Sequence, residues 1–398
     1  MHPNNRPRRK IPIRLTVVLL CLLPAWGAAG APPLFEETEL FVGGQDDINT
    51  YRIPALICTK SGTVLAFCEG RADNSDDGSP THLVLKRSAG NAREWKPQRG
   101  DRLVAPMRSR AVNMTWLPMQ VLLASRANEA YMNPVPIIDR TTGVIELLVN
   151  PYSHYAPRTE LQDARIWLLT SRDEGASWSK PIDLTPQVGA QELGPGIGIQ
   201  LSSGRLVAPT YRGVIYSDDH GAHWRVGGAA PGPVNESQVV ELSDGSLMRN
   251  TRGSPLRTIT ISRDGGVTWG EASRDPALTD PQLWDGCQAS LVRYTIASGE
   301  GTKNRLLFAN PADLRNRSFM TVRLSYDEGK TWPASKLIGN GAGAYSSLTI
   351  LPDGTIGLIY ETGGSHDGVV ESSAKLTFAR FNLEWLTDGR DHLTLSGR

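Results

Sequence analysis

The chain has 398 residues, of which 39% are hydrophobic and 21% charged, with 42 Lys and Arg against 41 Asp and Glu. This composition suits a protein with a packed core, and a formal net charge of +1 lacks the basic excess of a general nucleic-acid binder. The 40 Gly and 27 Pro indicate a turn-rich chain and argue against a helix bundle.

The first 31 residues differ from the rest of the sequence. A basic stretch without any acid is followed by a short apolar run (15–23) and by small residues that end in Ala29 and Ala31. This order is typical of a secretory signal peptide, and the run is shorter than the ~20 residues of a membrane-spanning helix. We therefore predict a signal peptide at 1–31, a secreted or periplasmic protein and no stable membrane insertion after cleavage. An uncleaved membrane anchor is the alternative.

Four later segments share the pattern Ser-x-Asp-x-Gly-x-x-Trp. A hairpin turn accounts for it, because the Asp can accept backbone N–H bonds, the Gly supplies a positive φ and the Trp covers apolar surface. A Ca²⁺ loop is the alternative, but one Asp per segment offers too few oxygen ligands. These Asp boxes are residues 171–178, 217–224, 262–269 and 325–332, and a degenerate copy at 88–95 has lost the Asp.

Turns of small residues, such as Asp244-Gly245 and Asp353-Gly354, alternate with the boxes and are flanked by apolar, strand-like residues. The combined repeat corresponds to about 60 residues per unit, the size of a four-stranded blade with its loops. We therefore predict an all-β, six-bladed β-propeller of four-stranded antiparallel blades, forming one domain at 32–398. A pair of β-sandwiches is the less favoured alternative. Helix is expected at most as a short turn near 382–386.

Sequence motifs of zinc peptidases and α/β-hydrolases are absent from the chain, and the seven His show no ligand spacing. Instead, polar residues stand at the ends of strand-like runs. Taken singly, each Arg is more simply explained as a solvated or ion-paired residue. In a propeller, however, the ends of the innermost strands surround one axial cleft, where these residues would converge. They are Arg52, Glu69, Arg71, Glu236, Arg252, Arg317, Tyr345 and Glu361.

Several of these residues lie in recognisable segments. Four such segments occur in order along the chain, together with the four Asp boxes. They are Tyr51-Arg52-Ile53-Pro54, Phe67-Cys68-Glu69-Gly70-Arg71, Asn235-Glu236-Ser237-Gln238 and Tyr345-Ser346-Ser347-Leu348. In this arrangement the sequence resembles the sialidases (exo-α-sialidases, neuraminidases) over roughly residues 41–381. Residues 108–130 resemble that family poorly, and we expect them to form loops over one blade.

The resemblance implies a binding site for the carboxylate of sialic acid. Arg52, Arg252 and Arg317 would form an arginine triad, since planar guanidinium groups can each donate two parallel bonds to a carboxylate. Arg315 competes with Arg317 for the third place. By the same resemblance, Glu361 would orient Arg52, and Arg71 would help to line the pocket.

The resemblance also implies the catalytic residues. Tyr345 would be the nucleophile, Glu236 the base that takes its proton, and Asp76 the acid/base on a mobile loop, with Asp77 and Asp73 as competitors. A neutral Tyr approaches the anomeric carbon, which carries a carboxylate, with less repulsion than an anionic nucleophile.

The implied activity is retaining hydrolysis of terminal sialic acids from glycoproteins, glycolipids and oligosaccharides, with no metal, no cofactor and no nucleic-acid partner. Two alternatives stay open. One is an enzyme that hydrolyses or transfers a related nonulosonic acid, and the other is a non-catalytic propeller that binds sialic acid.

Overall fold

The computed structural model describes residues 31–89, 114–126, 129–153, 164–363, 365–366, 369–370 and 373–393. The predicted signal peptide, apart from Ala31, and Trp95 of the degenerate box lie outside these residues. Within them the chain is almost entirely β-structure, which confirms the all-β prediction.

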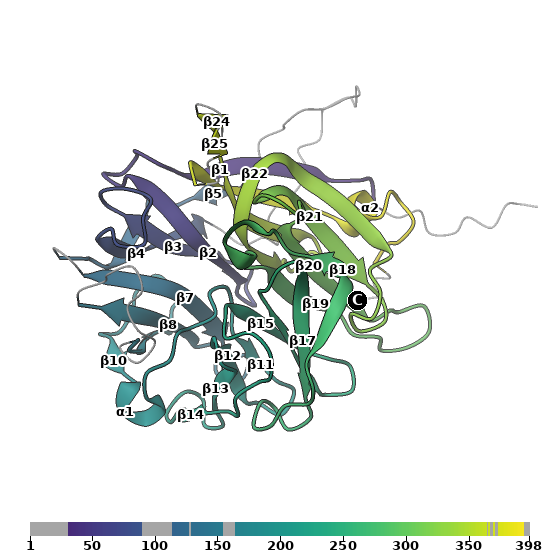
Figure 1. Cartoon of the computed structure of the whole chain (residues 1–398), viewed down its shortest axis with the longest axis horizontal. Coiled ribbons are helices and arrows are strands. Elements are labelled where there is room, and N and C mark those ends of the chain that lie inside the picture. Colours follow the sequence, from purple (N-terminus) through teal and green to yellow (C-terminus); the bar gives the residue numbers. More distant parts are fainter. Residues whose placement is uncertain are drawn as a thin grey trace, which may run out of the picture.

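The strands form sheets that are arranged around a central axis like the blades of a propeller (Figure 1). The first sheet contains β2 (Thr50–Cys58), β3 (Val64–Arg71), β4 (Thr81–Ala89), β7 (Ala130–Ile138), β8 (Ile145–Tyr152), β9 (Trp167–Ser171) and β10 (Ile182–Asp183). The second is β11 (Ile199–Gln200), β12 (Leu206–Pro209), β13 (Val214–Ser217) and β14 (Arg225–Val226). The third is β15 (Ser237–Glu241), β16 (Leu247–Thr251), β17 (Leu256–Ser262) and β18 (Ser273–Thr279).

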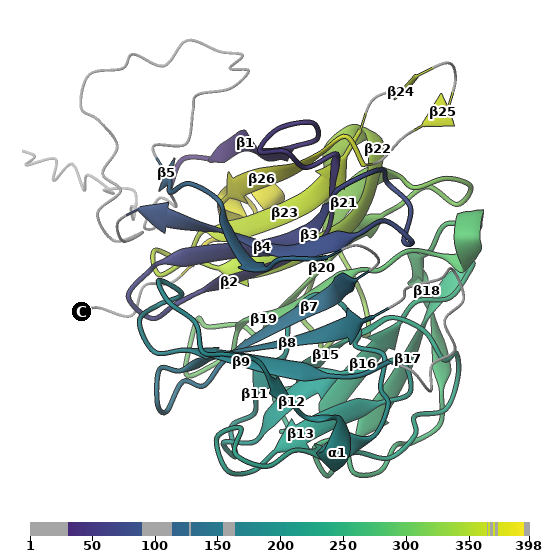
Figure 2. The ribbon, with the colours of Figure 1, turned by 90° about the vertical axis from the view of Figure 1, so that its left-hand side faces the viewer.

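The fourth sheet joins the two ends of the described chain. It contains β19 (Ser290–Thr295), β20 (Arg305–Pro311), β21 (Ser318–Ser325), β22 (Ala334–Ile350), β23 (Ile356–Thr362), β26 (Lys375–Phe381) and β1 (Phe35–Val42). Strand β1 pairs antiparallel with β26, with Phe35 opposite Phe381, and the two strands lie side by side in Figure 2. The amino-terminal strand thus completes a sheet built from the carboxyl-terminal part, a closure that the internal repeats did not predict.

The remaining elements are short. A two-stranded pair is formed by β24 (Ser365–His366) and β25 (Val369–Val370), and the helices are α1 (Thr185–Val188), the 3₁₀ turn η3 (Leu283–Asp285) and α2 (Leu383–Leu386). Helix α2 is the predicted turn near 382–386, and the Asn382 side chain caps it by accepting a bond from the Trp385 N–H at 3.0 Å. No helix of the described residues is long and apolar enough to span a membrane.

Residues 108–130 were expected to form loops, and this expectation is wrong for part of the segment. Residues Thr115–Trp116 form β5 and Gln120–Leu123 form β6, and both strands pair antiparallel with β4. Trp116 packs edge-on against Phe378, with 5.4 Å between the ring centres. The edge of β4 offers unpaired backbone groups, and these two strands satisfy them.

The four Asp boxes form the predicted turns. In each box the Asp accepts a backbone N–H bond of 2.8–2.9 Å from the residue before the Trp, and the Ser hydroxyl donates to the same carboxylate. The Gly at the fifth position has a φ between +78° and +95° in every box. The indoles then pack on apolar side chains, as Trp178 does on Phe67 and Trp332 on Phe308.

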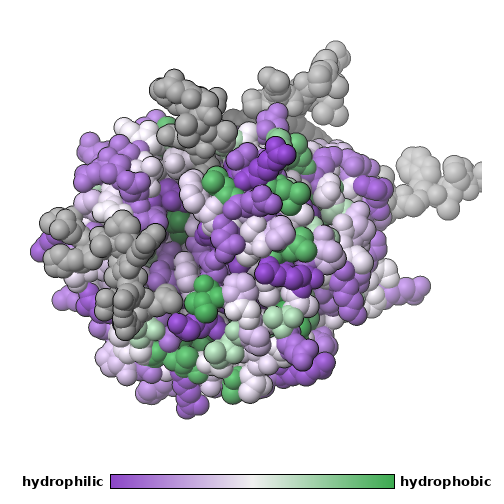
Figure 3. Space-filling model, in the orientation of Figure 1, coloured by the Kyte–Doolittle hydropathy of each residue, from purple (hydrophilic) through white to green (hydrophobic). Residues whose placement is uncertain are grey.

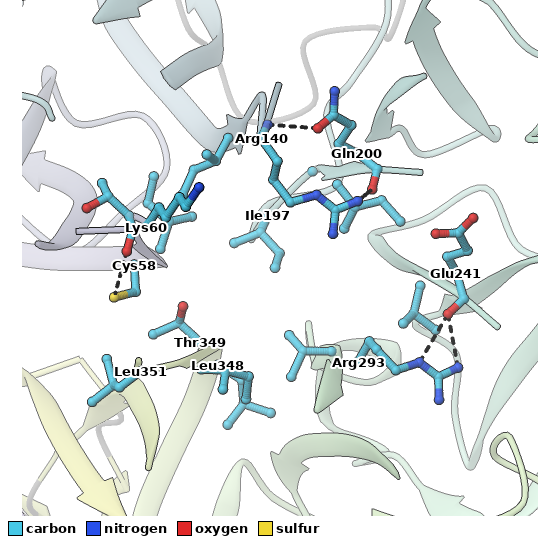
Figure 4. Close-up of a pocket in the computed structure, with 18 of the residues that line it drawn as sticks. Cys58, Lys60, Arg140, Ile197, Gln200, Glu241, Arg293, Leu348, Thr349 and Leu351 are labelled. Atoms are coloured by element: carbon cyan, nitrogen blue, oxygen red, sulfur yellow. Dashed lines mark hydrogen bonds between the residues drawn. The ribbon is translucent and has the colours of Figure 1, made fainter. Parts of the chain in front are cut away.

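A cavity of about 740 Å³ lies between strands β2, β7, β11, β15, β19 and β22 (Figure 4). Its wall is mainly apolar, and Arg140 and Arg293 are held against it by the backbone oxygens of Gln200 and Glu241. It is lined by the carboxyl ends of its strands, for example by Cys58 and Glu241, and by none of the predicted site residues. The site and the cavity therefore lie toward opposite ends of the same strands.

The outer surface does not present a continuous apolar face in the view of Figure 3, where hydrophobic residues occur in small groups among hydrophilic ones.

Candidate active site

A hydrogen-bonded group is formed by Tyr345, Glu236 and Arg252 at the end of the third sheet where β15 begins and β16 ends. Glu236 immediately precedes β15, Arg252 immediately follows β16, and Tyr345 lies within β22. The Tyr345 hydroxyl donates to Glu236 Oε1, while Arg252 Nη1 donates to Glu236 Oε2 at 2.6 Å and to Tyr345 Oη at 3.2 Å. The structure therefore brings the predicted nucleophile directly onto its predicted base.

Burial governs the chemistry of this pair. Tyr345 is 6% exposed and Glu236 4%. Burial and the nearby Glu236 carboxylate raise the pKa of Tyr345, against the opposing effect of Arg252 and two further arginines. The phenol is thus neutral in the resting site, and it can become a nucleophile only as its proton passes to the adjacent carboxylate.

Three arginines surround the Tyr345 ring. The guanidinium carbon of Arg52 lies 5.2 Å and that of Arg317 5.4 Å from the ring centre, and Arg252 bonds to the hydroxyl. The fully buried Glu361 fixes Arg52, because its Oε1 accepts from Arg52 Nε at 3.2 Å and from the Ile53 N–H at 2.9 Å. The structure thus unites the predicted triad with the Glu predicted to orient it.

Arg317 and Arg315 occupy different environments. Arg317 is 7% exposed, its Nη2 donates to the backbone oxygen of Gly286 at 3.0 Å, and its buried Nε has no hydrogen-bond partner in the described part of the chain. Arg315 is exposed, and its contacts run through its backbone. The geometry therefore supports Arg317 as the third arginine.

The acidic loop after β3 requires a correction. Arg71 Nη2 lies 2.8 Å from Glu69 Oε2 and 2.7 Å from Asp77 Oδ1, and Arg52 Nη1 lies 3.7 Å from the same Asp77 oxygen. The carboxylate of Asp76 forms no hydrogen bond or ion pair with any described residue. Asp77 thus takes the place that the sequence interpretation gave to Asp76, because the turn between Ala72 and Pro80 directs the second Asp toward the arginines.

The charges around Asp77 determine the pKa of its carboxyl group. Burial raises its pKa, but Arg71 and Arg52 outweigh burial and lower it. Glu69, in contrast, is fully buried, and burial raises its pKa despite the ion pair with Arg71. Glu69 therefore anchors Arg71 from the buried side, and Asp77 is the exposed carboxylate beside Arg71 and Arg52, with its side chain 54% exposed.

Comparison with known proteins assigns the chain to a family. The BNR repeat-like domain family matches residues 98–358. The chain is 34% identical to the sialidase of Micromonospora viridifaciens, covering 91% of this chain and 57% of that protein. It is 30% identical to the exo-α-sialidase of Aspergillus fumigatus, covering 94% and 98% respectively. The chain belongs to the exo-α-sialidase family. These enzymes are glycoside hydrolases, and the chain spans just over half of the Micromonospora protein and nearly all of the fungal one.

A solved structure supports the same assignment. The Hadza microbial sialidase Hz136 superposes with a TM-score of 0.71 at 28% identity, covering 88% of this chain and 69% of that one. The predicted sialidase resemblance is therefore confirmed, and the propeller-like character of the fold is shared with a sialidase.

The sequence interpretation missed one segment of the candidate site, residues 284–286. Trp284 is 65% exposed, and its ring lies 4.8 Å from the Arg317 guanidinium carbon. Arg252 Nε donates to the backbone oxygen of Asp285 at 3.3 Å. Trp284 and Asp285 have φ values of +54° and +53°, and a positive φ is uncommon for a bulky residue such as Trp. No repeat or motif marks this segment, so only an exposed Trp outside the boxes signalled it.

A second missed residue of the sialidase site is Glu192. Its Oε1 accepts bonds from the Tyr152 hydroxyl at 3.0 Å and from Asn133 Nδ2 at 3.3 Å, and Asn133 donates its N–H to Glu69. Burial raises the pKa of Glu192 to about 7, and Glu236 contributes in the same direction. The residue lies in a loop without a motif, just before Leu193-Gly194-Pro195.

No group of three or more His, Cys, Asp or Glu side chains that could hold a metal ion occurs in the described ranges. Several charged side chains of the site form ion pairs with one another, as Arg252 does with Glu236 and Arg71 with Asp77.

Proposed function

We propose that this protein removes terminal sialic acids from glycoconjugates by retaining hydrolysis through a covalent tyrosyl intermediate. The observation that carries the proposal is the buried hydrogen-bonded group of Tyr345, Glu236 and Arg252 beneath two further arginines. An anionic sugar fits this site, because its carboxylate can accept bonds from three guanidinium groups.

In the first step the Tyr345 oxygen bonds to the anomeric carbon while its proton passes to Glu236. The bond between that carbon and the glycosidic oxygen breaks, and Asp77 supplies the proton to the leaving oxygen. In the second step a water molecule gives a proton to Asp77 and attacks the same carbon. Tyr345 leaves and regains its proton from Glu236, so the configuration is inverted twice and therefore retained.

Asp77 must carry a proton to act as the acid, although its pKa is lowered in the resting site. A sugar carboxylate bound to Arg52 would neutralise one of the three arginines that lower this pKa and would bring a negative charge nearby. Both changes raise the pKa of Asp77. Substrate binding therefore prepares the acid that the reaction needs.

We also propose that the propeller has six blades. Six strands, one from each expected blade, line the axial cavity and support this count. Export remains our proposal as well, supported by the basic and then apolar order of residues 1–31. Sequencing the amino terminus of the secreted protein tests it, with cleavage after residue 31 as the expected result.

Tyr345→Phe tests the mechanism on a fluorogenic sialoside. We expect kcat to fall by about 10³-fold or more, because the substitution removes the nucleophilic oxygen and leaves the arginines in place. Tyr360→Phe is the matched control, since this buried Tyr also donates to a carboxylate, Glu37, away from the site. Full activity in Tyr345→Phe, or release of the inverted anomer by the wild type, would refute the proposal.

A further inference from the structure

One patch in the third sheet contains four buried hydrogen-bonding groups without partners. Arg249 Nη1 and the hydroxyls of Thr251, Thr258 and Thr260 form no hydrogen bond with any described residue. All four side chains are at most 3% exposed. Unpartnered buried polar groups are rare in folded proteins, because each costs the free energy of its lost hydration.

The strand register places these four side chains on the same face of the sheet. Arg249 lies directly opposite Thr260, and Thr251 lies directly opposite Thr258, in the antiparallel pairing of β16 with β17. Directly paired residues share a face and have Cβ atoms about 4.5–5.5 Å apart, and residues two apart along a strand share that face as well. The four side chains therefore form a quartet on one face of the sheet.

The charge of this quartet is uncompensated. Arg249 Nε donates to Ser237 Oγ at 3.1 Å, and its Nη2 donates to the backbone oxygen of Tyr211 at 2.8 Å. No described carboxylate pairs with Arg249. Burial, and the charge of Arg257, lower its pKa to about 10, so it remains a cation at neutral pH.

Arg257 shows how the same sheet treats another buried arginine. Its Nη1 lies 2.9 Å from Asp280 Oδ2, and its Nε donates to Asn250 on the opposite face of the strand pair. Both Arg257 and Asp280 are fully buried, so their charges compensate each other. A buried cation without an anion is strongly unfavourable, and Arg249 lacks the counterpart that Arg257 has.

We propose that Arg249, Thr251, Thr258 and Thr260 bind a buried monatomic anion, with chloride as the occupant in solution. Each group of the quartet can donate a hydrogen bond, since a guanidinium is donor-only and a Thr hydroxyl can turn its proton toward an acceptor. Water would satisfy the hydroxyls but would leave the charge of Arg249 uncompensated. A single negative charge satisfies both requirements.

The site would also support the catalytic base. Arg249 bonds to Ser237, which follows Glu236 in the chain, and to the backbone of Tyr211, whose carbonyl accepts the Asn235 N–H. An anion that fixes Arg249 would thereby stabilise the backbone on both sides of Glu236. The inference does not depend on the proposed reaction, because its primary readouts are ion binding and thermal stability.

Anomalous diffraction from crystals soaked in sodium bromide locates the ion directly. We expect a bromide peak within about 3.5 Å of Arg249 Nη1 and of the quartet hydroxyls. Ordered water at this position, with no anomalous peak, would overturn the proposal.

Thermal unfolding in solution provides the second test. At constant ionic strength, replacing sodium gluconate with sodium chloride should raise the wild-type Tm by about 4 °C, because an ion that binds only the folded state stabilises it. Thr260→Val and Arg249→Met should lose most of this rise. Thr349→Val, a change at another buried Thr of an inner strand, should keep it. An equal rise in all four proteins would overturn the proposal even if bromide binds in the crystal.

Discussion

The two ends of the inner strands are built on different principles. At the catalytic end, Tyr345 meets Glu236 across 109 residues of sequence, and Arg52 meets Glu361 across 309. At the cavity end, each Asp box closes its turn with bonds between residues two to four positions apart. The first box also touches the cavity, since its Glu174 lines the cavity and accepts a bond from the Thr63 hydroxyl at 2.7 Å.

Because of this difference, substitutions at one end should mainly change the stability of the protein, and substitutions at the other end should mainly change its activity. The hydrogen bonds of the box Asp lie within its own eight residues, so loss of that Asp should affect local stability and leave the distant site intact. The catalytic end depends on ion pairs between remote strands, so a single truncation there leaves a buried charge without its partner. Substitutions at the two ends should therefore change different measured quantities.

Between the two ends of the strands, the largest effect of a substitution is expected at Asp77. Asp77→Ala should lower kcat/KM by about 100-fold or more on a sialoside with a sugar leaving group, because that oxygen needs a proton as it departs. Asp76→Ala should change it less than about threefold, since the carboxylate of Asp76 makes no bond in the described structure. Steady-state kinetics on sialyllactose measures both.

An activated aryl sialoside sharpens this test. Its leaving group needs little protonation, so the defect of Asp77→Ala should shrink on that substrate if Asp77 is the acid. A larger defect in Asp76→Ala than in Asp77→Ala would restore the original sequence interpretation.

A smaller effect is expected from the third arginine. Arg317→Ala should raise KM by about 10- to 100-fold, which corresponds to one or two lost charged hydrogen bonds to the sugar carboxylate. Arg315→Ala should raise KM less than twofold, because Arg315 is exposed outside the triad. Arg317→Lys should recover little, since an ammonium group cannot reproduce the planar pair of donors. The reverse order of the two alanine variants would assign the third place to Arg315.

The sequence predicted most where the signal was local or lay in a recognisable segment. The box turns follow from Ser, Asp, Gly and Trp at fixed positions, and the structure contains the predicted bonds in all four. The family segments correctly brought Arg52, Tyr345 and Glu361 to one site. These residues lie at strand ends that face the same end of the propeller axis.

The sequence predicted least where side-chain direction or distant pairing decides the result. The offset from Arg71 could not distinguish Asp76 from Asp77, because the loop geometry determines which side chain turns inward. The pairing of β1 with β26 joins residues more than 300 positions apart, and no repeat encodes it. Trp284 lies beside Arg317 on a backbone with two consecutive positive φ angles, and a Trp rarely adopts such an angle.

The smallest effect is expected at the cavity end, in the third box. Asp264→Asn should lower the free energy of unfolding by about 1 kcal/mol at pH 7, because it weakens the bonds to the Thr268 N–H and hydroxyl. Unlike the changes at Asp77 and Arg317, it should leave kcat and KM unchanged. Glu271→Gln, a change at an exposed carboxylate just after the same box, is the matched control.

The pH dependence of this variant identifies the cause. Burial opposes ionisation of Asp264, but its bonds to Thr268 and Ser262 together outweigh burial and lower its pKa to about 2. A carboxylate with a lowered folded-state pKa stabilises the protein above its unfolded value near 3.9, and this stabilisation fades as the pH falls toward 2. The difference in stability between wild type and Asp264→Asn should therefore be largest at neutral pH and narrow below about pH 4.

Urea unfolding between pH 3 and 7 measures this difference in stability. Because Asp264 is exposed, high salt should reduce the difference further. A difference that does not change with pH would mean that the carboxylate's charge contributes nothing to the turn.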